Sequence, residues 1–271
     1  MAFGKFSIYN YPDYRKALKN IIEKLHKIKT RIGRIFLPIL FPRHCPVCRK
    51  IVSYGHKVCL SCYHKLPFVM YPTCYRCGKP ISDPAMEYCY DCRIFPKTFQ
   101  AGCSLFLYNQ LTQPAMVDYK YHNRRVLTDF YIEEFLYRYY PLMKSWGIQA
   151  VIPVPVHSSK KKKRGYNQAE LLSAAIADAL NIAHYPDLLI RRINTLPQKQ
   201  FTPQARLNNL RKAFTINPDY MVMRKKPARL LLVDDIYTTG ATMEACTRAL
   251  HHFGIEQVYV CSICIGASRD G

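Results

Sequence analysis

Four Cys-x-x-Cys pairs, spaced almost evenly in the first third of the chain, constrain the fold more than any other feature. They are Cys45/Cys48, Cys59/Cys62, Cys74/Cys77 and Cys89/Cys92. One turn can present both thiolates of such a pair to a metal ion, and each gap is long enough for a hairpin. We therefore predict a structural module with one or two closed Cys₄ zinc sites, whose metal supplies folding energy. The spacing leaves open whether neighbouring or alternate pairs share an ion.

Other cysteines and histidines are expected to have no metal role. Cys261 and Cys264 also match Cys-x-x-Cys, but they lie in an apolar run with strand character. Residues three apart on a strand face opposite sides, so this pair is interpreted as part of the core. The same interpretation covers Cys103 and Cys246, because free cysteine is commonly buried. Since cysteine fills every expected ligand position, the histidines near the pairs are expected at the surface: His44, His56 and His64.

The charge balance points to a polyanionic partner. The chain of 271 residues has 40 Lys and Arg against 18 acidic residues, a formal charge of +22. Such a field attracts nucleic acid, an anionic membrane face or phosphorylated metabolites, and basicity for solubility alone is the simpler alternative. The length allows one domain of ordinary size plus a small module, and 49% apolar residues suffice for a core.

The N-terminal part predicts a basic amphipathic helix over 15–36, with apolar residues at helical spacing between lysines and arginines. This helix is expected to dock on its own protein, and contact with an anionic membrane or nucleic acid is the alternative. No signal peptide and no membrane-spanning stretch is visible. Because twelve cysteines without an export signal indicate reduced thiols, we expect a cytoplasmic protein, with the inner face of the membrane as an open alternative.

From about residue 98 the pattern alternates between strand and helix, which predicts an α/β fold with a parallel sheet covered on both faces. The expected strands are Gln100 to Tyr108, Ala150 to Val154, Arg229 to Val233 and Gln257 to Ile265. The expected helices are 111–143, Asn167 to Leu180 and Thr242 to Phe253. Ligands of such sheets bind at the carboxyl ends of the strands.

The segment at 230–242 has the chemistry of a sugar-phosphate site at such a strand end. Asp234 and Asp235 follow an apolar strand, and Thr238-Thr239-Gly240 form a turn at a helix start. Backbone amides and hydroxyls there would hold a phosphate, and the carboxylates would accept hydrogen bonds from ribose hydroxyls. Gly240 would permit a left-handed backbone. The sequence has neither a P-loop nor a Gly-x-Gly-x-x-Gly motif, which weighs against those nucleotide-binding folds.

This segment resembles the hallmark of type I phosphoribosyltransferases, in which four apolar residues and two acidic residues precede a Thr-x-x-Thr-Gly-x-Thr type of loop. The resemblance implies a site for phosphoribosyl pyrophosphate, bound with Mg²⁺. The residues that it assigns to this site are Asp234, Asp235, Ile236, Tyr237, Thr238, Thr239, Gly240, Ala241 and Thr242.

A wider resemblance is to the ComF family, on Val-Ile-Pro-Val-Pro-Val at 151–156, Arg-Gly-Tyr-Asn-Gln at 164–168 and Arg-Leu-Asn-Asn at 206–209. It implies a double zinc ribbon over 44–97 and a phosphoribosyltransferase-like domain over 98–271, which follow the segment 1–43 with its basic amphipathic helix. It also implies a role in natural transformation, with incoming single-stranded DNA handled in the cytosol. The family is often labelled amidophosphoribosyltransferase-like, but the chain opens Met-Ala-Phe, so glutamine amidotransferase activity is not expected.

The loop predicted at 153–168 is strongly basic and would contact either pyrophosphate or a DNA backbone. With later cations and one aromatic side chain it forms the set of pyrophosphate- or DNA-binding candidates. This set is Lys160, Lys161, Lys162, Lys163, Arg164, Tyr166, Gln168, Arg191, Arg192, Lys199, Arg206 and Arg211.

Three functions remain open. The first is a DNA-binding competence protein whose sugar-phosphate site binds a ligand. The alternative is an active phosphoribosyltransferase acting on a nitrogen acceptor, for which the sequence offers no assignable general base; a scaffold with a vestigial site is a third interpretation. Whether the ribbon also meets a competence helicase, another protein of the uptake machinery or the membrane stays open.

Overall fold

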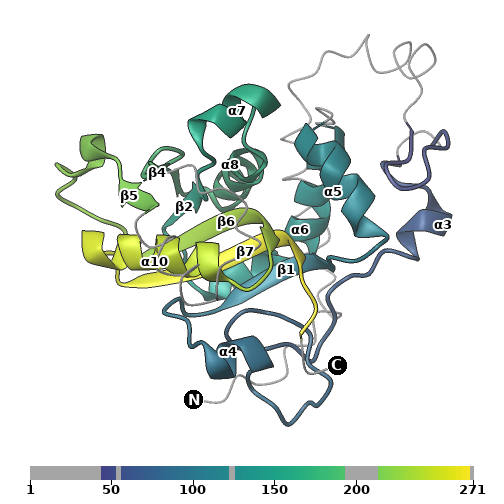
Figure 1. The fold of residues 1–271 in the computed structure, drawn as a ribbon, viewed down its shortest axis with the longest axis horizontal. Coiled ribbons are helices and arrows are strands. Elements are labelled where there is room, and N and C mark those ends of the chain that lie inside the picture. The colour runs from purple at the N-terminus through teal and green to yellow at the C-terminus, as the bar shows by residue number, and fades with distance from the viewer. Residues whose placement is uncertain (1–43, 53–55, 122–125, 193–212, 269–271) are drawn as a thin grey trace.

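A five-stranded parallel sheet forms the centre of the protein. The computed structural model describes residues 44–52, 56–121, 126–192 and 213–268. The strands are β1 (Gly102–Leu107), β2 (Ala150–Pro153), β3 (Ala183–His184), β6 (Arg229–Tyr237) and β7 (Gln257–Ile265). Their order is β1-β7-β6-β2-β3, and every neighbouring pair is parallel (Figure 1). The predicted α/β class with a parallel sheet is confirmed.

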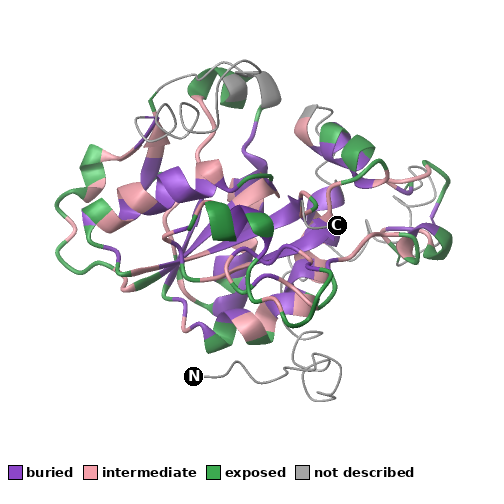
Figure 2. Ribbon diagram, turned by 60° about the horizontal axis from the view of Figure 1, so that its bottom comes forward, coloured by how far each residue is buried: buried purple, intermediate pink, exposed green. Residues whose placement is uncertain are grey.

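The apolar runs of the central strands explain this arrangement. Leu230 to Val233 of β6 are fully buried, as are Ala150 to Ile152 of β2. A strand that is apolar at successive positions can be stable only when both faces of its sheet are covered. Figure 2 shows the sheet as a continuous buried layer with exposed residues on the surrounding helices and loops.

Helices cover the two faces unequally. One face carries α5 (Thr112–Tyr121), α6 (Val126–Ser145) and α8 (Gln168–Leu180), which share a core with the first cysteine segment. The other face carries α10 (Ala241–Phe253), the antiparallel pair β4 (Leu189–Arg191) and β5 (Phe214–Ile216), and the second cysteine segment. A short 3₁₀ turn, η1 (Pro218–Tyr220), follows β5. The two halves of the cysteine-rich region therefore lie on opposite faces of one sheet.

The chain passes between these faces along the edge strand β1. Val69 N donates to the Leu105 carbonyl at 3.0 Å, and Leu107 N donates to the Pro67 carbonyl at 2.8 Å. Phe68 forms an isolated antiparallel bridge with Phe106. Figure 1 accordingly shows the short helices α3 (Leu60–Tyr63) and α4 (Tyr90–Ile94) in different parts of the molecule. Pairing with this segment also protects an otherwise open sheet edge.

The predicted strands and helices between 100 and 265 are present within a few residues of their expected bounds. Several details differ, among them the strand β3, which was not anticipated. The loop expected at 153–168 contains a helix, α7 (Ser158–Arg164), because His157 accepts a hydrogen bond from Ser159 N and Gly165 ends the helix at φ 77°. Strand β6 continues past the acidic pair to Tyr237, since β7 pairs with it that far. The β4–β5 pair was not anticipated, and the helix predicted at 15–36 lies outside the described residues.

Candidate functional site

Two clusters of four cysteines are present, and neighbouring pairs share each cluster. Cys45, Cys48, Cys59 and Cys62 form the first, and Cys74, Cys77, Cys89 and Cys92 form the second; within each, all Sγ atoms lie within 4.8 Å of one another. Tetrahedral zinc with Zn–S bonds of about 2.3 Å requires Sγ–Sγ separations of about 3.8 Å. The Cys48–Cys59 and Cys77–Cys89 separations are both 3.6 Å. The donor sets therefore fit two structural zinc ions, and pairing, which the spacing left open, follows from the fold.

The two clusters repeat one local geometry. In each, the amide of the first cysteine donates to a carbonyl five residues later, Lys50 or Lys79, at 2.7 Å. The residue after the second cysteine has a left-handed backbone, at φ 62° for Arg49 and 76° for Gly78. The third cysteine then caps a short helix that contains the fourth. Such repetition is that of two zinc ribbons in tandem.

The ribbons differ in how they are held. All four cysteines of the second are buried in a core shared with the sheet, whereas Cys48 and Cys59 of the first are half-buried. At Cys59, a hydrogen bond with the Ser61 hydroxyl lowers the pKa of the thiol to about 6, which favours the thiolate that a metal needs. The first ribbon is attached to α6 by the Lys57–Glu133 ion pair at 2.5 Å. Because its cysteines share a core with the sheet, the second ribbon is an integral part of the α/β domain.

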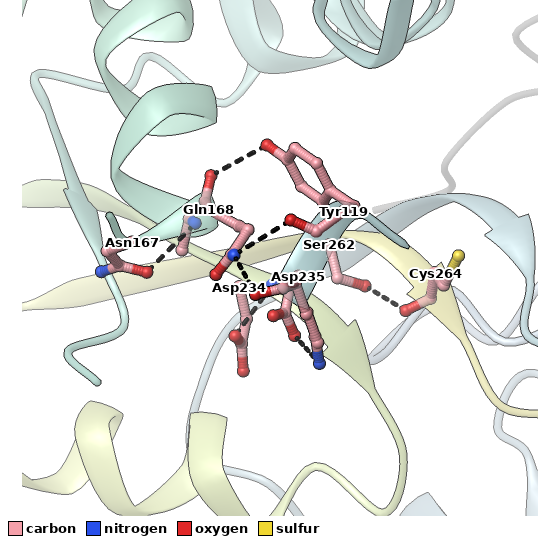
Figure 3. A network of polar contacts seen from close by, with 9 residues as sticks. Tyr119, Asn167, Gln168, Asp234, Asp235, Ser262 and Cys264 are labelled. Atoms are coloured by element: carbon pink, nitrogen blue, oxygen red, sulfur yellow. Dashed lines mark hydrogen bonds and ion pairs between the residues drawn. The ribbon is translucent and has the colours of Figure 1, made fainter. Parts of the chain in front are cut away.

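The acidic pair lies at the carboxyl end of β6, where the sequence predicted a ligand site. Asp235 N donates to Asp234 Oδ1 at 2.8 Å, and Figure 3 shows the two carboxylates side by side. Burial, together with the neighbouring Asp235 carboxylate, raises the pKa of Asp234 to about 7. One proton is therefore gained or lost at this pair near neutral pH.

A lysine from α5 forms an ion pair with one of these two aspartates. Lys120 Nζ lies 2.9 Å from Asp235 Oδ1, with both side chains largely buried. The end of α5 is held by donors to its last carbonyls: Tyr166 Oη to Tyr119 O at 2.6 Å, and Gln168 Nε2 to the carbonyls of Tyr119 and Lys120 at 3.2 and 3.3 Å. Figure 3 shows Gln168 reaching Tyr119 beside the aspartates. These contacts position the Lys120 ammonium.

The turn after β6 has the backbone that the sequence predicted. Gly240 caps α10 with φ 77°, and Thr238 and Thr239 are exposed on the turn. A Cβ at Gly240 would lie 2.1 Å from Tyr237 Oη, so the tyrosine fills the space under the turn. Its ring is in edge contact with Phe99 at 6.4 Å and lies 6.0 Å from Lys79 Nζ of the second ribbon. The second ribbon thus supports the turn from below.

The loop after β2 leaves the sheet beside the turn that follows β6. Pro153 pairs with Val233, and Val154 N donates to Val233 O at 2.7 Å. Asn167 caps α8 by accepting from Ala169 N and donates to the Val154 carbonyl at 3.1 Å. The carboxyl ends of β2 and β6, with the N-termini of α8 and α10, therefore meet at one edge. This is where a doubly covered parallel sheet binds ligands.

Most of the predicted site residues fall into three groups. Asp234, Asp235 and Thr238 to Thr242 surround this edge, and Arg191 on β4 is close enough to Asp234 for each charge to shift the pKa of the other. Lys161, Lys162 and Arg192 are exposed, and Lys161 forms an ion pair with Glu170 at 3.2 Å. The side chains of Lys160, Lys163, Arg164, Lys199, Arg206 and Arg211 lie outside the described residues.

Three side chains have roles other than those predicted. Tyr166 is buried and bonded to α5, so it is not exposed for stacking on a base, and Gln168 is fully buried for the same reason. The Tyr237 side chain points into the core shared with the second ribbon, where burial raises the pKa of its hydroxyl well above the usual value. Tertiary packing against α5 and against the ribbon recruits these side chains, which the local sequence does not reveal.

Comparisons with known proteins agree with this architecture. A family model described as "Double zinc ribbon domain" matches residues 36–93. Competence protein ComFC of Bacillus subtilis is 26% identical over 206 residues, which cover 74% of this chain and 80% of that protein. DNA utilization protein YhgH of Salmonella typhimurium is 25% identical over 227 residues, covering 82% and 97%. The chain is homologous to these ComF-like proteins.

One relative matches more closely over a shorter stretch. Competence protein F of Haemophilus influenzae is 33% identical over 112 residues, which is 41% of this chain and 48% of that protein. The chain therefore spans about half the length of that relative in the match. Together the matches show homology to competence and DNA-utilisation proteins over most of the chain, and a double zinc ribbon in its N-terminal part.

Lys120 is the site residue that sequence analysis of this ComF homologue missed. It lies in a helix far from the acidic pair along the chain, between Tyr119 and Tyr121. No local motif marks it; only the packing of α5 beside β6 brings its ammonium to Asp235. A single basic residue in a run of helical sequence is most often a solvated charge.

Among the described residues, no helix is long and apolar enough to cross a membrane.

Proposed function

We propose that this protein is a cytoplasmic ComF-like protein of DNA uptake that binds single-stranded DNA and holds phosphoribosyl pyrophosphate at the edge formed by β2 and β6. The observation that carries the proposal is the junction of the acidic pair, the Gly240 turn and the N-terminus of α10 in a homologue of competence proteins. Each feature alone is common in α/β proteins. Their convergence at one strand end supports a sugar-phosphate site there.

The chemistry of the site supports a ribose phosphate. The amides of the turn and the positive end of the α10 dipole suit the 5′-phosphate, while the carboxylates accept hydrogen bonds from ribose hydroxyls. Mg²⁺ would accompany the pyrophosphate, since it binds carboxylate and phosphate oxygens and keeps part of its water shell. Asp234 and Asp235 are the residues that would face it. Lys120 lowers the cost of keeping two carboxylates together.

The basic balance of the chain supports the DNA-binding part. The formal charge of +22 is partly concentrated at α7, where Lys161 and Lys162 are exposed beside the ligand edge. Single-strand binding that rests on phosphate contacts weakens with salt by a slope of about −0.7 per contact. The experiment is the salt dependence of binding to a fluorescent oligo-dT. Removing both lysines should weaken binding and reduce the steepness of the slope by about 1.4.

A matched control exists at the opposite ends of the strands, where β6 begins. Arg224 and Lys225 are exposed just before β6 begins, so the double alanine variant removes the same charge away from the ligand edge. We expect this control to keep most of the wild-type affinity. Absence of oligo-dT binding by the wild-type protein, or binding insensitive to salt, would reject the DNA-binding role.

Phosphoribosyl pyrophosphate binding has a separate test. ³¹P NMR of the zinc-loaded protein with the ligand and Mg²⁺ should show line broadening that Asp235→Asn abolishes. Asp178→Asn, an equal change at an exposed position of α8, should leave the broadening intact. Equal spectra for wild type and Asp235→Asn would reject this assignment.

The alternative function is a true phosphoribosyl transfer, and one observation favours it. A carboxyl with a pKa of about 7 is suited to take a proton from a nitrogen acceptor, and Asp234 is such a group. In that reaction the acceptor nitrogen forms a bond to the ribose carbon while the bond between that carbon and pyrophosphate breaks. Pyrophosphate released only when an acceptor is present would establish this function; broadening without release would establish binding alone.

A further inference from the structure

The exposed aromatic side chains of the described residues are concentrated on one small part of the protein. Tyr71, Tyr75, Tyr88 and Tyr90 of the second ribbon are 70%, 44%, 37% and 36% exposed. Elsewhere in the described ranges only Tyr137, at 40%, reaches a comparable exposure among aromatic residues. Tyrosine is usually half-buried, so a cluster of this kind indicates a surface that contacts something.

The second zinc site holds most of these tyrosines rigidly. Tyr75 directly follows Cys74, and Tyr88 and Tyr90 flank Cys89, so three of the four tyrosines adjoin a cysteine of the buried Cys₄ set. The rings of Tyr75 and Tyr88 touch edge to face, with centroids 6.5 Å apart. A tyrosine side chain has few rotamers, and a backbone tied to a metal site loses little further entropy on binding.

The ribbon that carries these tyrosines is joined to the rest of the protein by buried polar contacts. Lys79 Nζ and Asp91 Oδ2 form an ion pair at 2.5 Å with both side chains almost inaccessible. Lys79 Nζ also donates to the Ala267 carbonyl at 3.3 Å, and Arg76 Nη1 donates to the Phe99 carbonyl at 2.5 Å. The tyrosines are therefore carried by the α/β core and do not belong to a detached module.

Charge separates the two ribbons. Residues 44–66 of the first contain Arg49, Lys50, Lys57 and Lys65 and no acidic residue. Residues 67–97 of the second contain four basic and three acidic residues, and the exposed ones are Asp83, Glu87 and Arg93. Any polyanion drawn by the protein's overall charge would gain little electrostatic energy at the second ribbon itself. What that ribbon offers is aromatic rings.

We propose that the exposed tyrosines of the second ribbon, Tyr71, Tyr75, Tyr88 and Tyr90, form a stacking platform for the bases of single-stranded DNA. The proposal rests on the DNA-binding role proposed above and locates the base contacts, which Tyr166 cannot provide because it is buried. Base stacking on aromatic rings tolerates any sequence and needs no local charge. The strongly basic remainder of the chain supplies the attraction for the phosphates.

The test compares oligo-dT with an abasic oligonucleotide of the same length, by fluorescence anisotropy with the full-length zinc-loaded protein. Wild type should bind oligo-dT more tightly than the abasic strand. Tyr71→Ala and Tyr75→Ala should each weaken oligo-dT binding about fivefold or more, leave abasic binding unchanged and leave the salt slope unchanged. Tyr75→Phe should restore binding, because stacking needs the ring and not the hydroxyl.

The control is Tyr137→Ala, which removes from α6 a tyrosine about as exposed as Tyr75 and should change neither affinity. Zinc content measured on each variant shows that both Cys₄ sites are intact. If wild type binds oligo-dT but the ribbon variants bind it equally well, the platform is refuted and the surface is left for a protein partner. If wild type binds neither strand, the proposed function fails first, so the two failures are distinguishable.

Discussion

Replacing Gly78 by alanine should strain the contact between the second ribbon and the sheet and lower the free energy of unfolding. The structure sets the size of this loss. Gly78 has φ 76°, and a Cβ there would lie 2.5 Å from the Gly102 carbonyl oxygen and 3.1 Å from Cys103 Cα. Both obstacles are backbone atoms of β1, which cannot rotate away. Gly102 cannot retreat, since it pairs with Val260 in the adjacent strand.

Two costs should therefore add in Gly78→Ala. The left-handed backbone costs alanine about 1–2 kcal/mol, and forcing atoms into a filled contact costs about 1–3 kcal/mol more. Gly165→Ala isolates the first cost, because Gly165 has φ 77° and nothing lies within 4 Å of its added Cβ. We expect a loss of about 1–2 kcal/mol in the free energy of unfolding for Gly165→Ala and about 2–5 kcal/mol for Gly78→Ala.

The assay is urea unfolding followed by the fluorescence of Trp146, the single tryptophan, which stacks on Tyr259 of β7 at 4.8 Å. Because Trp146 lies in the α/β domain, it reports whether damage at the ribbon reaches the sheet. Zinc content should also fall in Gly78→Ala, since Cys77 precedes the altered residue. Equal losses for the two variants would show that the contact between the ribbon and β1 contributes nothing, and would refute the reasoning.

Two further predictions concern pH and zinc. Because the folded pKa of Asp234 is about 7 and thus above its ordinary value, the native state binds more protons than the unfolded chain between about pH 4 and pH 7, so stability falls as pH rises through this window. Asp234→Asn should therefore gain stability relative to wild type between pH 4 and pH 7, by at most about 1.4 kcal/mol per pH unit, and a pH-independent difference in urea midpoints would contradict the shift. Zinc released to a chromophoric chelator should appear in two phases, because Cys48 and Cys59 of the first ribbon are half-buried and should release their ion faster. Cys48→Ser should remove the fast phase only. A single phase carrying both ions would show that the sites are equivalent.

Local patterns in the sequence were sufficient for the main strands and helices and for the type of the two metal sites. The four Cys-x-x-Cys pairs indicated closed zinc sites because thiolate spacing is a local property, and the homology and the Sγ clusters agree. The run from Leu230 to Thr242 indicated a buried strand, an acidic end and a glycine turn. The turn backbone at Gly240 is present as predicted, while the role of these residues in binding stays a prediction.

Contacts between distant segments were decided only by tertiary structure. The pairing of neighbouring cysteine pairs, the separation of the ribbons onto opposite faces of the sheet and the crossing along β1 depend on how apolar surfaces find each other. Lys120 reaches Asp235, and Tyr166 and Gln168 turn inward, because α5 packs beside the end of β6. A sequence specifies which side chains carry charge, rings or thiols. Burial and the competition for hydrogen-bond partners, which exist only in the folded chain, select those that face a ligand and those that hold the framework.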